Sequence, residues 1–450
     1  MLEYQQRPPL TENKAQINLK SLTKGFNSVK HKAFTCLIIF ICLSLAFSGC
    51  ASQGRATDLM ADIKPSQNSN SPDQIDKNIK KEINAFSADL FKKSAENEGN
   101  IMISPISVYL ALAMTLNGAE GETKAAMLDV LADQGLTVDM INDACRSWIA
   151  LLERTDSKTK LEIANSIWFD QDFTPYKPFL QKNADFFNAD INKLDFNDPN
   201  APKIINKWVK EATHNTIDKI VNSIDPDVVM YLINAVYFKS NWQTEFNKNN
   251  TRDRTFNTPD GPITTPFMHR LGRMTYFSIN KATGVALPYA DERFAYFALL
   301  PDKEMTPREW LAKQDQSLFT DLARLVAQKP KYTVQLATPK FEAHYEDSLT
   351  DELTELGIGI AFDPDLADFS QMNEQHSKGL YISEVKHKTF IRVDEKGTEA
   401  SAATSVEVQV TSAPQSDKEL IFDRPFLYGV MDLQTGIPLF VGIMENPAAE

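Results

Sequence analysis

Residues 394–410 of this 450-residue chain read DEKGTEASAATSVEVQV. From Thr398 onward, every second residue is small or β-branched, namely Thr398, Ala400, Ala402, Thr404, Val406, Val408 and Val410. Such alternation is typical of a strand with one buried face, because successive side chains point to opposite faces of a sheet. The polar stretch TSAPQSDKE that follows (411–419) is instead typical of an exposed loop. The run therefore predicts a segment with two states, a loop and a strand.

The composition around this run is that of a globular protein, with 42% hydrophobic and 24% charged residues. A formal net charge of −13 excludes a nucleic-acid binder, because no basic surplus is present to neutralise phosphates. Helical patterns dominate the first half, including the apolar segment 106–118 after Ser104-Pro105. Strand patterns dominate the second half, at 230–238, 294–300, 332–338, 389–393, 426–431 and 437–444. The pattern predicts one large mixed α+β domain that begins near Asn78.

The N-terminus has the pattern of an export signal. A basic region over residues 1–32 precedes the uncharged stretch 33–49, which ends at Gly49-Cys50. The sequence LAFSGC resembles a bacterial lipobox, although Phe47 replaces the usual Leu. We expect a lipoprotein-type signal peptide over 1–49, lipidation of Cys50 and a flexible tether over 50–77. Ordinary secretion is the alternative, and the long basic region is compatible with a true start downstream of Met1.

The cysteines leave no disulfide framework. Cys36 and Cys42 fall in the predicted signal, and Cys50 would carry the lipid, so only Cys145 remains in the domain. Cys145 has no CxxC partner, which favours a small buried hydrophobe over a nucleophile.

Five segments of the chain resemble the serpin family, in the family's order. They are NIMISPISVYLALAMTLNGAEGET (100–123), LINAVYFKSNW (232–242), LGIGIAFDPDLADFSQM (356–372), HKTFIRVDEKGTEASAAT (387–404) and RPFLYGVMDLQTGIPLFVGIMENP (424–447). The chain departs from the family at Asn215-Thr216, where Gly-Lys is usual, and at Ile443, where Arg is common.

The resemblance implies the serpin fold, with helices packed on a large central mixed sheet, further sheets and an exposed reactive-centre loop at about 397–418. A single domain would cover 78–450. It also implies an irreversible suicide-substrate inhibitor of serine proteases and not an enzyme. The protease would cleave the loop and remain in a covalent acyl complex while the loop inserts into the central sheet. We expect a monomer without a cofactor, whose partners are the target protease and, through the lipid, the membrane.

The residues of the run suit insertion. Small residues at its leading end keep the steric barrier low, whereas Glu399 and Glu407 fall on the face that solvent can reach. A strand of about fourteen residues spans roughly 46 Å. The hinge predicted from the resemblance consists of Glu395, Gly397, Thr398, Glu399, Ala400, Ser401, Ala402, Ala403 and Thr404.

The family's usual spacing from the hinge Thr398 predicts a reactive bond at Thr411-Ser412, with Gln409, Val410 and Ala413 as alternatives. No Arg or Lys occurs from Thr398 to Gln415, which disfavours trypsin-like targets. Small and β-branched residues favour elastase-like or subtilisin-like serine proteases, and cysteine proteases stay open as targets.

The resemblance assigns Ser104, Ser107, Asn234 and His387 to a polar cluster beneath the sheet, the shutter, and Trp242 to the breach, where the loop would first enter. No GxSxG elbow surrounds either serine, which disfavours an envelope hydrolase. The six His show no metal-ligand spacing, so we expect no metal. A non-inhibitory serpin, acting as a binding or chaperone-like envelope protein, is the other alternative. We expect export to the cell envelope, in the outer membrane of a Gram-negative cell, with surface exposure or secretion left open.

Overall fold

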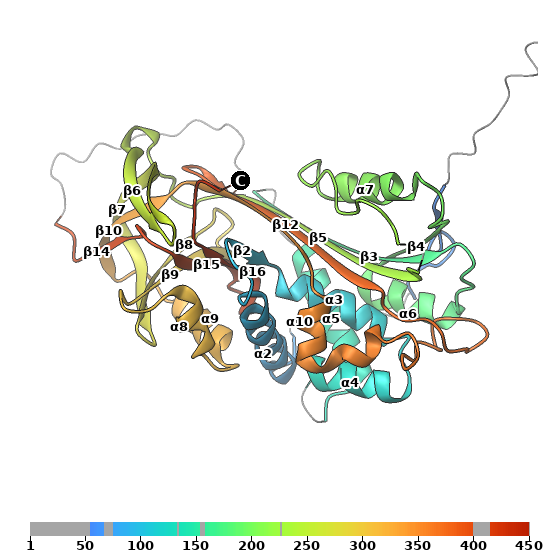
Figure 1. Cartoon of the computed structure of the whole chain (residues 1–450). Coiled ribbons are helices and arrows are strands. Elements are labelled where there is room, and N and C mark those ends of the chain that lie inside the picture. The colour runs from blue at the N-terminus through green and yellow to red at the C-terminus, as the bar shows by residue number, and fades with distance from the viewer. Residues whose placement is uncertain are drawn as a thin grey trace, which may run out of the picture. The chain divides into compact units, whose positions relative to one another are not determined.

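The computed structural model describes residues 55–66, 75–132, 135–153, 158–225, 227–398 and 415–449 (Figure 1). The predicted α+β class is confirmed, because these residues form both α-helices and two multi-stranded sheets. The α-helices are α2 (Lys77–Ser94), α3 (Pro105–Leu116), α4 (Gly121–Leu131), α5 (Val138–Glu153), α6 (Lys177–Phe187), α7 (Ala201–Ala212), α8 (Pro307–Ala312), α9 (Leu318–Val326) and α10 (Thr350–Leu353). Short non-α turns are η1 (Lys248–Asn250), η2 (Thr354–Ile358) and η3 (Gly359–Phe362).

A seven-stranded sheet has the order β1-β4-β3-β5-β13-β12-β11, and β5 also pairs directly with β12. Its strands are β1 (Thr57–Asp58), β3 (Thr159–Asp170), β4 (Asp190–Leu194), β5 (Met230–Asn241), β11 (Phe341–Ser348), β12 (Glu384–Val393) and β13 (Gly397–Thr398). The β5–β12 pair is parallel, whereas β3 and β11 run antiparallel to their neighbours β5 and β12. This sheet is the large central mixed sheet that the sequence predicts.

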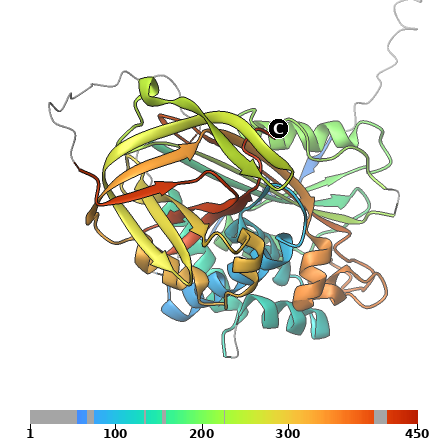
Figure 2. The same ribbon diagram turned by 60° about the vertical axis from the view of Figure 1, so that its left-hand side comes forward.

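A second sheet contains nine strands, ordered β14-β10-β7-β8-β9-β15-β16-β2, with β6 paired to β7 (Figure 2). Its strands are β2 (Ile101–Ile103), β6 (Arg252–Thr258), β7 (Gly261–Ile279), β8 (Ala282–Pro288), β9 (Phe294–Pro301), β10 (Tyr332–Pro339), β14 (Lys418–Ile421), β15 (Phe426–Asp432) and β16 (Ile437–Met444). The six strand patterns recognised in the sequence fall in β5, β9, β10, β12, β15 and β16.

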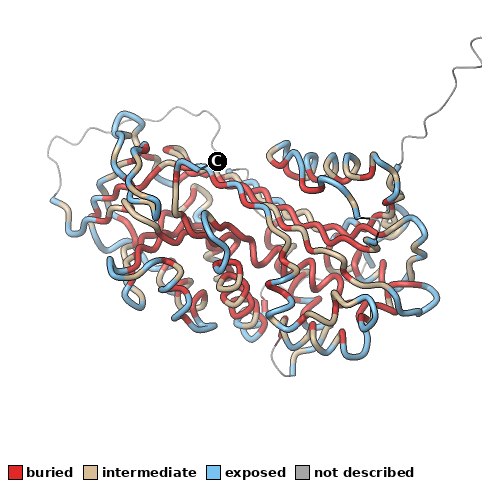
Figure 3. The backbone as a smooth tube through the Cα atoms, in the orientation of Figure 1, coloured by how far each residue is buried: buried red, intermediate tan, exposed pale blue. Residues whose placement is uncertain are grey.

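Helices cover both faces of the seven-stranded sheet, with α7 on one face and α3 on the other (Figure 1). Residues 230–238 of β5 are therefore all buried, which explains why this strand is apolar without alternation. The α7 side forms a separate apolar cluster in which Ile205 and Val209 join Trp168 and Ile233. On the opposite side, all twelve residues of α3 are buried, as its apolar sequence predicts (Figure 3).

Residues 55–66 differ from the flexible tether that the sequence predicts for 50–77. Strand β1 pairs antiparallel with β4, and the Leu59 N–H donates to the Ile191 carbonyl over 2.9 Å. The Asp185 carboxylate accepts a hydrogen bond of 2.7 Å from the Ser66 N–H. This part of the segment therefore lies against β4 and α6. The polar composition suggests disorder, but β4 would otherwise be an edge strand and offers backbone partners.

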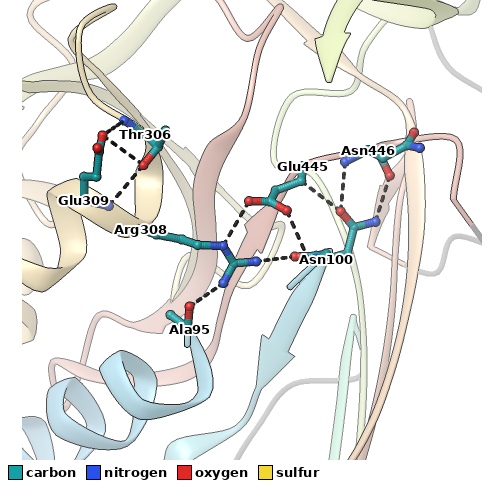
Figure 4. A network of polar contacts seen from close by, with 8 residues as sticks. Ala95, Asn100, Thr306, Arg308, Glu309, Glu445 and Asn446 are labelled. Atoms are coloured by element: carbon teal, nitrogen blue, oxygen red, sulfur yellow. Dashed lines mark hydrogen bonds and ion pairs between the residues drawn. The ribbon is translucent and has the colours of Figure 1, made fainter. Parts of the chain in front are cut away.

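The end of the chain is fixed to the beginning of the domain by a polar network (Figure 4). Arg308 forms an ion pair of 3.0 Å with Glu445 and donates to the Gly99 carbonyl over 2.7 Å. The Asn100 side chain accepts from the backbone N–H groups of Glu445 and Asn446 at 2.8 and 2.9 Å. These contacts hold the ends of β16 and β2, which also pair with each other.

No helix among the described residues is both long and apolar enough to cross a lipid bilayer.

Candidate functional site

The strand β13 is a wedge at one end of the β5–β12 pair. Tyr231–Val236 of β5 pair directly with Glu384–Thr389 of β12. Further along, Thr398 pairs with Ser240 of β5 and with Val393 of β12. Because Thr398 lies between the two strands, the sheet is already parted at this end. The described part of the predicted hinge therefore sits at the entrance to the central sheet.

Gly397 fits this position because no other residue can. A Cβ atom at Gly397 would lie 2.1 Å from the Ser240 carbonyl oxygen and 2.6 Å from the Asn241 Cα. Both are backbone atoms, so the contact could not be relieved by turning a side chain. Glycine is thus required for the close approach of β13 to β5.

Two stacked aromatic rings contact β13 and the turn that precedes it. Trp242 and Tyr289 stack with their ring centroids 4.8 Å apart and an interplanar angle of 11°. The Trp242 indole N–H donates to the Asp394 carbonyl over 2.8 Å, and its backbone N–H donates to Lys396 over 2.7 Å. The Tyr289 hydroxyl forms a hydrogen bond of 2.6 Å with the Thr398 hydroxyl. Trp242 therefore lies at the predicted breach, in contact with the turn between β12 and β13.

Glu395 is a buried carboxylate in that turn. Its two oxygens bind Lys340 Nζ at 3.0 Å and the Thr251 hydroxyl at 2.8 Å. Burial raises the pKa of Glu395, but backbone hydrogen bonding, Lys340 and Thr251 outweigh burial and lower the pKa overall. The ionised carboxylate thus ties the turn to β6 and to the connection between β10 and β11.

The four predicted shutter residues do meet, and all four are fully buried. They are joined by a series of hydrogen bonds: His387 Nδ1 lies 2.6 Å from Asn234 Oδ1, and the Asn234 amide donates to the Ser107 hydroxyl. The Asn234 amide also donates to the side chain of Asn165 on β3 over 2.5 Å. Because Asn234 and His387 are register partners on β5 and β12, the cluster crosses the junction that β13 enters further along.

The hydrogen bonds fix the state of the histidine ring. The Ser104 backbone N–H can only donate, so the His387 Nε2 that lies 3.1 Å away accepts, and Nδ1 carries the proton given to Asn234. Burial lowers the pKa of His387 to about 3, in agreement with a neutral ring. The Ser104 hydroxyl has no hydrogen-bond partner among the residues that the structure describes, so this serine and His387 do not form a nucleophile–base pair. Ser104 is the N-cap residue of α3, but its side chain makes no capping hydrogen bond to the described part of the helix.

Several predicted positions lie outside the described residues. They are Cys50, the hinge residues Glu399, Ala400, Ser401, Ala402, Ala403 and Thr404, and the loop residues Gln409, Val410, Thr411, Ser412 and Ala413. Cys145 is described and buried, and burial raises the pKa of its thiol, which is the behaviour of a structural cysteine.

Sequence reasoning missed Tyr289, Lys340, Thr251 and Asn165. Their partners are 55 to 144 residues away along the chain, so no local pattern reports the contacts. Asn165 carried the one available signal, because it is a polar residue within the strand-like run IANSIWF. Among the described residues, no group of three or more His, Cys, Asp or Glu side chains is placed to bind a metal ion.

Comparison with known proteins assigns the class. The family model "Serpin (serine protease inhibitor)" matches residues 81–447, so the chain belongs to the serpin family. Members of this family are typically protease inhibitors and not catalytic enzymes.

Individual relatives agree with this assignment. The chain is 33% identical to an uncharacterized serpin-like protein of Thermococcus kodakarensis, over 81% of this chain and 85% of that protein. It is 32% identical to human serpin B8, over 80% of this chain and 97% of that protein.

Among solved structures, the chain resembles tengpin, a thermophilic serpin. For the native state, the identity is 38% and the TM-score is 0.81, covering 87% of this chain and all of that one. For the latent state, the TM-score is 0.71 over 83% of this chain and 99% of that one.

The buried neutral His387 predicts a pH dependence of stability. Its pKa is about 3 in the folded protein and about 6.5 when unfolded, so the unfolded chain binds the extra proton between these values. The histidine's contribution is complete above about pH 6.5 and declines by up to about 1.4 kcal/mol per pH unit as the pH falls toward 3. We expect His387→Gln, which keeps one donor and one acceptor, to flatten this decline.

Urea unfolding midpoints between pH 4 and 8 measure the effect. His376→Gln, at an exposed histidine, is the matched control and should keep the wild-type slope. A His387→Gln variant that loses stability on acidification as steeply as the wild type would contradict the assigned role of burial.

Proposed function

We propose that this serpin is an irreversible suicide-substrate inhibitor of serine proteases. A protease cleaves the reactive-centre loop, about 397–418, and the freed strand then inserts between β5 and β12. The observation that carries this proposal is the position of Thr398, which is fully buried between these two strands. We propose that the inhibitor acts as a monomer and needs no cofactor.

The burial of Thr398 sets the phase of the inserting strand. Its hydroxyl contacts Tyr289 in the core, so even-numbered residues of a strand that continued from it would also point inward. In the sequence these are Ala400, Ala402, Thr404, Val406, Val408 and Val410, all of which suit a buried face. Glu399 and Glu407 would point outward, which avoids burying an unpaired charge.

The acceptor strands are long enough for this insertion. β5 contains 12 residues and β12 contains 10. At about 3.3 Å per residue, these strands are roughly 33–40 Å long, comparable to the strand that 398–410 could form. The backbone N–H and C=O groups through which β5 and β12 now pair with each other would then form hydrogen bonds with the new strand.

Insertion must break the contacts that close the sheet. The direct bond between Asn234 and His387 crosses the path of the strand, so it must be released. Burial of Val406, Val408 and Val410 opposes this loss, at roughly 1.5–3 kcal/mol for each side chain. Once the loop is cut, the residue before the cut carries the acylated protease. This end of the inserting strand is then free to move away from the residues after the cut, and the protease moves with it. Distortion of the protease then preserves the acyl bond.

A protease panel tests the proposal and its specificity. We expect elastase-like or subtilisin-like enzymes to form complexes that survive denaturing gels, and trypsin-like enzymes to form none, because no Arg or Lys occurs from Thr398 to Gln415. Mass spectrometry should place the cut at Thr411-Ser412, or at least within 409–413. Cleavage without any stable complex would favour the non-inhibitory alternative of a binding or chaperone-like protein. A cut elsewhere would refute the bond assignment.

Substitution of the wedge residue tests the insertion step. Thr398→Arg should fold but become a substrate, because a buried unpaired guanidinium costs several kcal/mol and slows insertion tenfold or more. The stoichiometry of inhibition measures the competition between trapping and turnover. Thr398→Val is the matched control, since it keeps the shape and loses only the bond to Tyr289. Unchanged stoichiometry in the Arg variant would contradict insertion through this end of the sheet.

We further propose that the protein is exported and anchored by a lipid on Cys50, in the outer membrane of a Gram-negative cell. The support is the uncharged stretch 33–49 followed by Cys50. Wild-type protein should incorporate labelled palmitate and partition into detergent, and Cys50→Ser should do neither. Partition of the wild type into the aqueous phase would favour ordinary secretion.

A further inference from the structure

One segment within the domain of this acidic chain carries a net positive charge. The whole chain carries a formal net charge of −13. Residues 239–273 carry six Lys or Arg and three Asp or Glu, a net charge of +3. This segment contains the turn η1, the strand β6 and the first part of β7. Its charge is therefore opposite in sign to that of the protein as a whole.

None of these six cations forms an ion pair with an acidic side chain among the described residues. Lys248 on η1 and Arg252 on β6 are exposed, and Arg254 is half-buried. Arg252 and Arg254 lie two residues apart, so their side chains leave the same face of β6 as the buried Phe256. We refer to Lys248, Arg252 and Arg254 as the β6 basic surface.

The two arginines lie near one histidine of β7. Arg252 pairs with Phe267 and Arg254 with Thr265, which precede His269 on β7. Burial lowers the pKa of His269, and the positive charges of Arg252 and Arg254 lower it further. Asp253 lies between them in sequence, but its side chain leaves the opposite face of β6.

The β6 basic surface lies beside both attachments of the reactive-centre loop. At one end, Thr251 binds the hinge carboxylate of Glu395 at 2.8 Å. At the other end, the Asn257 N–H donates to the Asp423 carbonyl over 2.8 Å, two residues after β14 ends. Strand β6 therefore runs between the segment that leads into the loop and the segment that follows it (Figures 1 and 2). We expect a protease bound to the loop to approach the domain from this side.

We propose that Lys248, Arg252 and Arg254 form a secondary docking surface for the target protease, and that this protease carries acidic side chains beside its active-site cleft. The inference rests on the proposed inhibitory function and adds a property of the partner. Since the loop offers only small and β-branched residues near the expected cut, it distinguishes poorly among proteases with a small first pocket. The basic surface would add selectivity and a faster encounter.

The charge pattern favours a protein partner over a linear polyanion. The β6 basic surface consists of only three cations, so it offers few partners to a polymer with evenly repeated negative charge. A folded protease can place a few carboxylates against the cations alone. Electrostatic steering of this kind raises association rates by about 10- to 1,000-fold and weakens beyond the Debye length of about 8 Å at physiological salt.

The experiment uses the full mature protein and one elastase-type protease that forms the complex. The protease is used unmodified and after conversion of its surface lysines to carboxylates with succinic anhydride, which makes its rim more acidic. The variant Arg252→Glu/Arg254→Glu is compared with Lys313→Glu/Arg324→Glu, which makes the same charge change on and beside α8 and α9. Association rate constants and inhibition stoichiometry are measured at about 50 mM and about 1 M NaCl.

We expect the succinylated protease to associate with the β6 variant about tenfold more slowly than with the wild type at low salt, and at nearly the same rate at high salt. The stoichiometry should not change, because the arginines do not take part in insertion. The control variant should associate at a rate close to that of the wild type.

Equal rates for the β6 and control variants would overturn the docking surface while leaving the inhibitory function intact. Absence of any complex with the wild type would overturn both. Equal rates, with retention of the wild type but not the β6 variant on immobilised heparin at about 0.15 M NaCl, would assign the surface to a polyanion instead.

Discussion

The hydrogen bond between Asn234 and His387 joins the two strands between which the proposed insertion would take place. It joins β5 to β12 where the two strands are in register, and it connects through Ser107 and Ser104 to the first turn of α3. Every member is fully buried, so each bond that opens leaves polar groups without water to replace the partner. The cluster therefore keeps the sheet closed below the wedge. A neutral histidine suits this position, because it donates through one ring nitrogen and accepts through the other.

The other end of the same strand pair is held open. Gly397 allows β13 to approach the backbone of β5, and Thr398 fills the first position between β5 and β12. Trp242, Tyr289 and Glu395 fix the turn that leads to this position. Strands β5 and β12 thus pair directly over Tyr231–Val236 and are separated by Thr398 a few residues further along β5. In the proposed mechanism, the inserting strand would start at Thr398 and would have to break the bond between Asn234 and His387.

Much of the fold was predictable from local sequence. The strands β5, β9, β15 and β16 and the helix α3 contain apolar runs that are buried on both sides. In β10 and β12 burial alternates along part of the strand, as in a strand with one buried face. Strands with one polar face or only two residues were missed, including β1 and β6. β1 exists only because the edge of β4 is available to it, which no property of residues 57–58 reports. Ser104, Ser107, Asn234 and His387, which the family resemblance groups together, are joined by hydrogen bonds, but the resemblance did not point to Asn165, Lys340 or Tyr289.

The sequence by itself determined the alternation from Thr398 to Val410, the absence of Arg and Lys near the expected cut, and the family. These are local properties, since they depend on which side chains follow one another. The tertiary structure alone decided that Thr398 faces the core, that His387 is neutral, and that Glu395 is held by Lys340 and Thr251. Burial and hydrogen bonding across sequence separations of 55 to 283 residues produce these properties, and they arise only when the strands are assembled.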